Sequence, residues 1–208
     1  MKIAPRRILL PLMTIVLLVV FPLISYLVVK KGADIRKNAT YSSFLHPSKE
    51  GIPPLELISH RGDTITNKVL KGKVSVLEFI DHTSVDLTNE RHPLFELQEA
   101  YKGKTLSLRM LSVWSDSTVT ATVGLLNFFA TRFAVRENWH VLSGTGIDAL
   151  QHSIAALYNE NLTLSGDDFF PHSVYLINKE GKFCGAYDPM NKAEFDALFN
   201  DVLYLIDQ

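Results

Sequence analysis

The sequence predicts an α/β sandwich domain preceded by an N-terminal transmembrane helix. The chain has 208 residues, of which 47% are hydrophobic and 21% are charged, enough for one globular domain and an additional apolar element. Residues 8–29 form an uncharged apolar run, and residues 52–208 alternate strand-like and helix-like patterns. We therefore expect three parts: a membrane anchor over residues 1–31, a linker over 32–51 and a folded domain over 52–208.

The apolar run of residues 8–29 has the length of a transmembrane helix. At roughly 1.5 Å per residue, a helix of this length spans the ~30 Å hydrocarbon core of a bilayer. A cleavable signal peptide usually has a shorter apolar region, of roughly 7 to 15 residues. Basic residues flank both ends of the run, so charge alone does not select an orientation. They are Lys2, Arg6 and Arg7 before it, and Lys30, Lys31, Arg36 and Lys37 after it. We expect a retained, single-pass anchor.

The first half of the domain predicts a hairpin, a central strand, a helix and another strand. Residues 55–59 and 64–66 flank a polar turn, as the strands of a short hairpin do. Residues 74–80, VSVLEFI, are largely apolar and rich in strand-forming residues, which is typical of a central strand. Residues 86–101 place leucines on one helical face, and residues 106–114 are expected to form the next strand.

The second half of the domain predicts two more helices, a second hairpin and a closing helix. Apolar residues recur at helical spacing over 119–133 and 147–158. Two strands, 173–178 and 183–187, flank a KEGK turn, and an amphipathic helix over 192–206 ends the chain. This order of elements is that of an α/β sandwich of the thioredoxin type.

Composition and cysteine content exclude several functions. A net charge of −1 and a pI near 6.7, without a basic stripe, argue against nucleic acid as a partner. The single cysteine, Cys184, excludes an intramolecular disulfide and a multi-cysteine metal site. Cys184 lies in an apparent strand, FCGAY, where packing is its most common role. We therefore expect no thiol-disulfide enzyme, and we identify no catalytic residue.

Several segments, in this order along the chain, together resemble the SCO/SenC family. They are KGKVSVLEFIDHTS, the strand followed by Ser112-Val113, WHVLSG from Trp139, HSVYLINKEGK from His172, and GAYDP from Gly185. Proteins of this family are membrane-anchored and thioredoxin-like, bind copper, and help to assemble the copper centre of cytochrome c oxidase. The resemblance covers residues 52–208. It implies copper as a ligand, a respiratory oxidase subunit as a partner, and a domain on the non-cytoplasmic side of the membrane.

The same resemblance implies where copper ligands would lie. The family places a C-x-x-x-C pair on the turn after the KGKV strand and a histidine before a later strand. In this sequence the two cysteine positions fall on Ser84 and Thr88, and the histidine falls on His172. Cu(I) is a soft ion that selects thiolate and thioether ligands, so two neutral hydroxyls are poor replacements. Of the implied set, His172 alone remains as a candidate metal ligand.

Alternatives remain open for this loop and for the function of the chain. Asp81, His82, Asp86 and His172 could supply oxygen and nitrogen ligands to Zn(II), Cu(II) or Mn(II). The T-x-x-D pattern over 83–86 is more typical of a helix cap than of a metal site, and His172 is more typical of a solvated or hydrogen-bonded loop residue than of a ligand. The chain could be a divergent SCO/SenC protein of copper homeostasis or a non-enzymatic interaction module that no longer binds copper. A peroxiredoxin-like or thioredoxin-like reductase is disfavoured by the cysteine count.

Overall fold

The structure is a computed structural model and consists of two compact units, Met1–Thr40 and Tyr41–Gln208. The residues that it describes are 16–37, 41–81, 92–104, 106–116, 121–162 and 173–208. The boundary between the units lies before Tyr41 rather than at residue 52, where the sequence predicted the domain to begin.

The first unit is helical. A short π-helical segment, Val16–Val20, leads into α2, Phe21–Lys37, and its apolar side chains between Leu18 and Val29 are largely exposed. Among the described residues, no helix combines the length and the apolar character needed to cross a membrane. Residues 8–15 of the expected anchor lie outside the described residues. Residues 32–37, expected as the start of the linker, continue α2.

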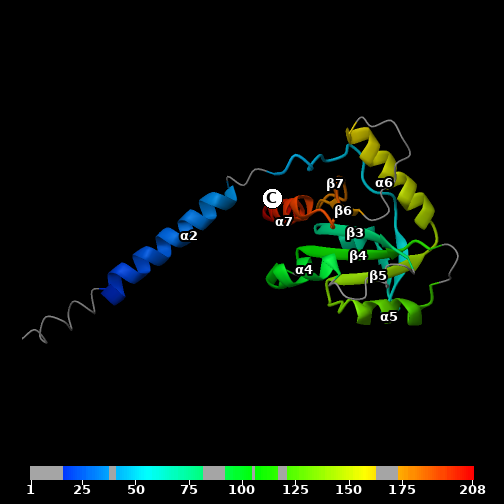
Figure 1. The fold of residues 1–208 in the computed structure, drawn as a ribbon, viewed down its shortest axis with the longest axis horizontal. Helices are drawn as coiled ribbons and strands as arrows, with labels where there is room; N and C mark the ends of the chain where they lie inside the picture. The colour runs from blue at the N-terminus through cyan, green and yellow to red at the C-terminus, as the bar shows by residue number, and fades with distance from the viewer. Residues whose placement is uncertain (1–15, 38–40, 82–91, 105, 117–120, 163–172) are drawn as a thin grey trace, which may run out of the picture. The chain divides into compact units, whose positions relative to one another are not determined.

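The second unit is built on a seven-stranded sheet with the order β2-β1-β5-β4-β3-β6-β7 (Figure 1). Strands β3, β4 and β5 are parallel, whereas β1, β2, β6 and β7 join antiparallel to their neighbours. The strands are β1 Glu56–Ser59, β2 Thr64–Thr66, β3 Val74–Ile80, β4 Leu108–Trp114, β5 Trp139–Gly144, β6 Val174–Ile177 and β7 Phe183–Tyr187. This confirms the expected mixed α/β sheet of the thioredoxin type.

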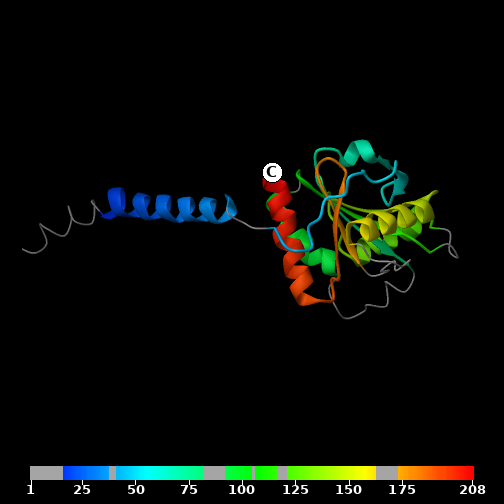
Figure 2. The same cartoon turned by 90° about the horizontal axis from the view of Figure 1, so that it is seen from above.

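Helices cover both faces of the sheet, and Figure 2 shows α6 and α7 on opposite sides of it. The buried side chains of α4, α5 and α7 form one core cluster, and those of α3 and α6 form the other. The helices are α3 Asn67–Leu70, α4 Pro93–Ala100, α5 Val123–Arg132, α6 Ile147–Leu162 and α7 Lys192–Asp207, with a 3-10 turn, η3, at Lys102–Lys104. The sheet is thus the middle layer of a sandwich.

Strand β3 is the central strand that its sequence predicted, with every residue buried. Val74, Val76 and Ile80 contribute to the cluster under α4, α5 and α7, whereas Leu77 and Phe79 contribute to the opposite cluster. Alternate side chains of a strand point to opposite faces, so a strand with both faces covered is apolar throughout. Ser75 and Glu78 are the polar exceptions to this pattern, and Glu78, on the same face as Val76 and Ile80, is the charged one.

Two parts of the domain differ from the sequence-based expectation. Strand β5 was not predicted, although its WHVLSG segment pairs with both β4 and β1. Residues 41–50, which we call the strap, were predicted to belong to a linker but pack on the domain. Leu45 is buried in the core, and the backbone amides of His46 and Ser48 donate hydrogen bonds to carbonyls of β7. The strap therefore extends the sheet edge at β7.

Candidate functional site

Of the residues singled out for metal binding, the structure describes Asp81, which immediately follows β3. Ser84, Thr88 and His172 lie outside the described residues, as do His82 and Asp86. The predicted helix over 86–101 is described from Pro93, where α4 begins. The site is therefore built from the described residues that flank the β3–α4 connection.

Three buried side chains, Glu78, Ser112 and Trp139, form a polar row across the adjacent parallel strands β3, β4 and β5, close to the start of this connection. Glu78 of β3 is the Cα partner of Ser112 of β4, and the Ser112 hydroxyl donates a hydrogen bond to Glu78 Oε1. The indole Nε1 of Trp139, on β5, donates to Ser112 Oγ at 2.8 Å. A continuous chain of hydrogen bonds thus runs from β5 through β4 to the carboxyl group on β3.

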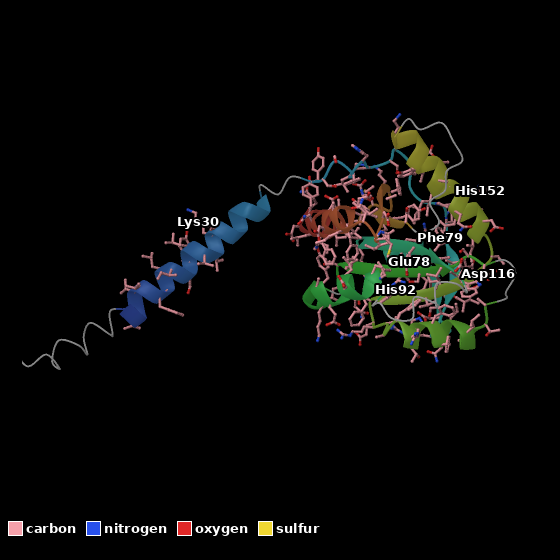
Figure 3. All side chains as sticks on the ribbon, in the orientation of Figure 1. Lys30, Glu78, Phe79, His92, Asp116 and His152 are labelled. Atoms are coloured by element: carbon pink, nitrogen blue, oxygen red, sulfur yellow. The ribbon has the colours of Figure 1, made fainter. Side chains whose placement is uncertain are left out.

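His92, immediately before α4, completes this row from the other side of the connection. Its Nε2 lies 3.4 Å from Glu78 Oε1, and Figure 3 shows the two residues close together. The His92 ring packs against Phe133 and Trp139, with centroid distances of 4.2 and 5.4 Å. Its Nδ1 is buried and has no hydrogen-bond partner within the described part of the chain. The contact between Glu78 and His92 therefore links the end of β3 to the start of α4.

Burial sets the protonation of this pair. Loss of solvent raises the pKa of Glu78 to about 8, and the hydrogen bond from Ser112 only partly opposes that rise. Loss of solvent also lowers the pKa of His92 to about 4. At neutral pH the carboxyl is mainly protonated and the imidazole is uncharged. Both groups are therefore uncharged at neutral pH, and both side chains are largely buried.

Sequence reasoning did not single out Glu78 or His92. The available indication was Glu78 itself, the one charged residue in the run VSVLEFI. A carboxyl group on a strand that is buried on both faces must be protonated or paired, because an isolated buried charge is very costly. His92 carried no comparable indication, since only the fold brings it next to β3.

The described residues do not fit a Cu(I) site. No group of three His, Cys, Asp or Glu side chains within the described ranges could hold a metal ion. Glu78 and His92 supply one oxygen and one nitrogen donor, whereas Cu(I) prefers sulfur. Cys184 is fully buried on β7, and burial raises the pKa of its thiol to about 12, so it is not a thiolate at neutral pH.

Cys184 also lies at the wrong end of the sheet for chemistry at the β3–α4 connection. Its neighbour Phe183 pairs with Ile177 of β6, and Ile177 pairs with Ser75, near the start of β3. The connection follows Ile80, at the other end of β3. At about 3.3 Å per residue, Ser75 and Ile80 are roughly 16 Å apart along the strand. The single thiol is therefore remote from the connection.

The fold and this site together define a thioredoxin-like domain with a buried acid beneath its β3–α4 connection. Similar solved structures are BsSco, from the Sco family of cytochrome c oxidase assembly proteins (TM-score 0.60, 19% identity), and a SCO1/SenC family lipoprotein from Bacillus anthracis (0.56, 20%). The matches cover 79% and 80% of this chain, and 98% and 99% of those chains. The copper-bound ScoI of Bradyrhizobium japonicum is similar over 73% of this chain (98% of that chain; TM-score 0.51, 18% identity).

These structures confirm the resemblance to SCO/SenC proteins at the level of the fold. The same fold is shared with a protein described as a disulfide isomerase from Bacteroides thetaiotaomicron (TM-score 0.53, 17% identity), covering 81% of this chain and 96% of that chain. No protein-family model and no curated protein matches the sequence. The domain therefore has the fold of the SCO/SenC proteins, and its activity has to be inferred from its own residues.

Proposed function

We propose that this chain is a membrane-anchored, SCO/SenC-like protein that acts in respiratory-oxidase assembly or copper homeostasis by binding a protein partner, without carrying Cu(I) or catalysing a reaction. The similar structures include oxidase assembly proteins and a copper-bound relative. The apolar run of residues 8–29 supports the anchor, and the resemblance supports a domain on the non-cytoplasmic side.

The position of Cys184 is the observation that supports this proposal most strongly. The fold is shared with proteins whose names refer to copper or to disulfide chemistry, and both chemistries use sulfur. This chain has one thiol, and that thiol is buried on β7 at the far end of the sheet. The family's cysteine positions hold Ser84 and Thr88, whose hydroxyl groups cannot replace thiolates in either role.

We infer that the β3–α4 connection, with Ser84 and Thr88, and His172, which the family resemblance groups with them, form the surface that contacts the partner. The connection is tethered at both ends, because Glu78 before it and His92 after it contact each other. A loop with fixed ends loses less conformational entropy on binding than a loop with free ends, which favours association. His172 is retained in this proposal as a partner contact or as a ligand for a metal supplied by the partner.

Purification of the full chain from the membranes of its own organism tests the proposal. We expect a respiratory oxidase subunit to co-purify, and copper measured by elemental analysis to be far below one ion per chain. Cys184→Ser should change neither result, since the thiol is remote from the connection. Full copper occupancy that persists without the oxidase subunit would instead indicate a copper carrier.

Protease accessibility tests the membrane arrangement separately. If the domain lies on the non-cytoplasmic side, protease added to intact spheroplasts should cleave the chain after Lys31. Complete protection until the membrane is permeabilised would contradict the proposed orientation.

A further inference from the structure

A polar pocket of about 540 Å³ lies at the amino end of β5, away from the β3–α4 connection. Arg61 of the β1–β2 turn, Gln98 of α4, Lys102 of η3 and the α5–β5 connection, residues 136–138, contribute to its walls. This volume is within the range of small-molecule sites, roughly 300 to 1,000 Å³. The proposed partner surface does not use these residues.

Two buried amide side chains in this pocket differ sharply in their hydrogen bonding. Gln98 and Asn138 are each 1% exposed. Gln98 Nε2 donates to the carbonyl of Ala134 at 3.1 Å, and its Oε1 accepts from the amide of Arg136 at 2.8 Å. Neither Oδ1 nor Nδ2 of Asn138 has a hydrogen-bond partner in the described parts of the chain. Buried polar groups nearly always have partners, and Asn138 lines the pocket, so its amide is the candidate to pair with a ligand bound there.

The charges around the pocket are unevenly compensated. Arg136 forms an ion pair with Glu99 at 2.5 Å. The Arg61 guanidinium donates instead to the neutral backbone carbonyls of Arg136 and Glu137, at 2.9 and 3.4 Å. Among the described residues, neither Arg61 nor Lys102 has an ion-pair partner, although the Glu137 side chain also lines the pocket. The pocket therefore combines two positive charges without an ion pair, Arg61 and Lys102, with the carboxylate of Glu137, which leaves a net positive charge for a ligand to neutralise.

The surroundings of Arg61 are also electropositive. Burial and, after it, the charge of Arg61 lower the pKa of His60, His140 and Arg109. Asp63, in the same turn as Arg61, accepts a hydrogen bond from Ser59 and has a lowered pKa, so it is ionised and offsets part of this charge. Asp63 and Glu137 are two carboxylates against the three cations Arg61, Lys102 and Arg109, since the lowered pKa values leave His60 and His140 neutral.

We propose that this pocket binds a phosphate group through Arg61, Lys102 and the side-chain amide of Asn138. A phosphate with one protonated oxygen offers acceptors to Asn138 Nδ2 and a hydroxyl donor to Asn138 Oδ1. Its negative charge neutralises Arg61 and Lys102, and charge-assisted hydrogen bonds of this kind are among the strongest in proteins. A phosphodiester, such as a phospholipid head group, shares the charge but lacks the hydroxyl donor and should bind more weakly.

Calorimetric titration of the full chain in detergent with inorganic phosphate tests this site. Asn138→Leu should weaken phosphate binding roughly tenfold or more, the cost of losing hydrogen bonds to a charged group. The same change should raise the thermal unfolding midpoint without phosphate, because it removes an unpartnered buried amide. Lys102→Gln, an exposed substitution, should also weaken binding. Lys49→Gln, an exposed lysine on the strap, is the matched control and should leave binding unchanged.

A second titration, with glycerophosphoglycerol, separates free phosphate from a lipid head group. The diester should bind more weakly than inorganic phosphate. Tighter binding of the diester, lost in Asn138→Leu, would overturn the pairing of Asn138 with a phosphate hydroxyl and would identify a phospholipid head group as the ligand. Equal phosphate affinity of the native chain, Asn138→Leu and Lys102→Gln would overturn the proposal, as would absence of binding at millimolar phosphate. If Asn138→Leu fails to fold, unchanged affinity of Lys102→Gln is sufficient to reject the site.

Discussion

Glu78 places a carboxyl group inside the sheet, and its protonation should govern how stability depends on pH. Its pKa in the folded state, about 8, is above the ordinary value of 4.5, so between these values the folded chain binds more protons than the unfolded chain. Stability linked to Glu78 therefore falls as pH rises through this window. The pKa of His92 is lowered from 6.5 to about 4, so its contribution rises with pH between 4 and 6.5. Below pH 6.5 the two groups therefore change the free energy of unfolding in opposite directions as pH rises. Above pH 6.5, of these two groups, Glu78 alone contributes to the pH dependence.

We therefore expect Glu78→Gln to flatten the pH dependence of stability between pH 6.5 and 8. One pKa unit corresponds to about 1.4 kcal/mol, so Glu78 should account for a loss of about 2 kcal/mol across this interval. Urea unfolding of the native chain and the variant at both pH values measures the difference. If the free energy of unfolding changes equally between the two pH values in both proteins, Glu78 is not protonated in the folded state near neutral pH.

Ser112 and Ser75 provide a matched pair of buried hydroxyl groups. Ser112 joins Trp139 to Glu78, whereas Ser75 Oγ has no hydrogen-bond partner among the described residues. Ser112→Ala leaves the Trp139 indole N–H and the Glu78 carboxyl without this partner and should cost about 1–3 kcal/mol of unfolding free energy. Ser75→Ala should be near neutral or slightly stabilising. Equal losses of unfolding free energy in Ser112→Ala and Ser75→Ala would contradict a structural role for the polar row.

At the scale of elements, strands and helices with a regular hydrophobic pattern could be predicted from the sequence. Segments of mixed or polar composition that pair with the sheet could not. Strand β3 and helix α7 follow ordinary strand and helix periodicities, and both were predicted close to their observed bounds. Strand β5 was missed because WHVLSG mixes polar and apolar residues. The strap was missed because its composition is typical of a linker and its partners are distant in sequence.

The candidate site shows the same division between local pattern and tertiary contact. Ser84, Thr88 and His172 could be proposed from sequence, because the resemblance to the SCO/SenC family assigns ligand positions to them, and this assignment stays a prediction. Glu78 could be recognised as an unusual residue for a buried strand. Its contact with His92 could not be predicted, because the length of the connection between them does not determine how close its two ends lie in space. Asn138 and Lys102 likewise meet only through the packing of separate connections.

The strap should be an integral part of the domain. Its Ser42 hydroxyl and amide both donate to the buried carboxylate of Asp201, and Leu45 enters the core. Gly185 of β7 permits the close approach, because a Cβ there would lie 2.6 Å from the carbonyl oxygen of Phe44. Removal of the strap thus exposes an apolar cluster and leaves Asp201 with fewer partners.

A domain that begins at Ile52 should therefore be less stable than one that begins at Tyr41, by about 3 kcal/mol or more. Urea unfolding of the two domains measures this difference. Leu45→Ala in the longer domain is the control for the apolar part and should cost about 2–4 kcal/mol. Equal stability of the two domains would mean that the strap is the spacer that its composition suggested.

At the scale of the whole molecule, a fold similar to that of BsSco and of the copper-bound ScoI is combined with a sequence that has a single cysteine. The chain keeps the sheet, the covering helices and a tethered β3–α4 connection. Its one thiol is buried on β7. A change of ligands, rather than a change of fold, would then separate this chain from a copper carrier.

Cu(I) affinity, measured by competition with a chromogenic chelator, tests this account most directly. The full chain should bind Cu(I) far more weakly than a Ser84→Cys, Thr88→Cys double variant, because two thiolates supply the soft, anionic donors that two hydroxyls cannot. Adding His172→Ala to the double variant should weaken binding again if the scaffold places all three residues together. Cu(I) binding by the native chain as tight as that of the double variant would contradict the account.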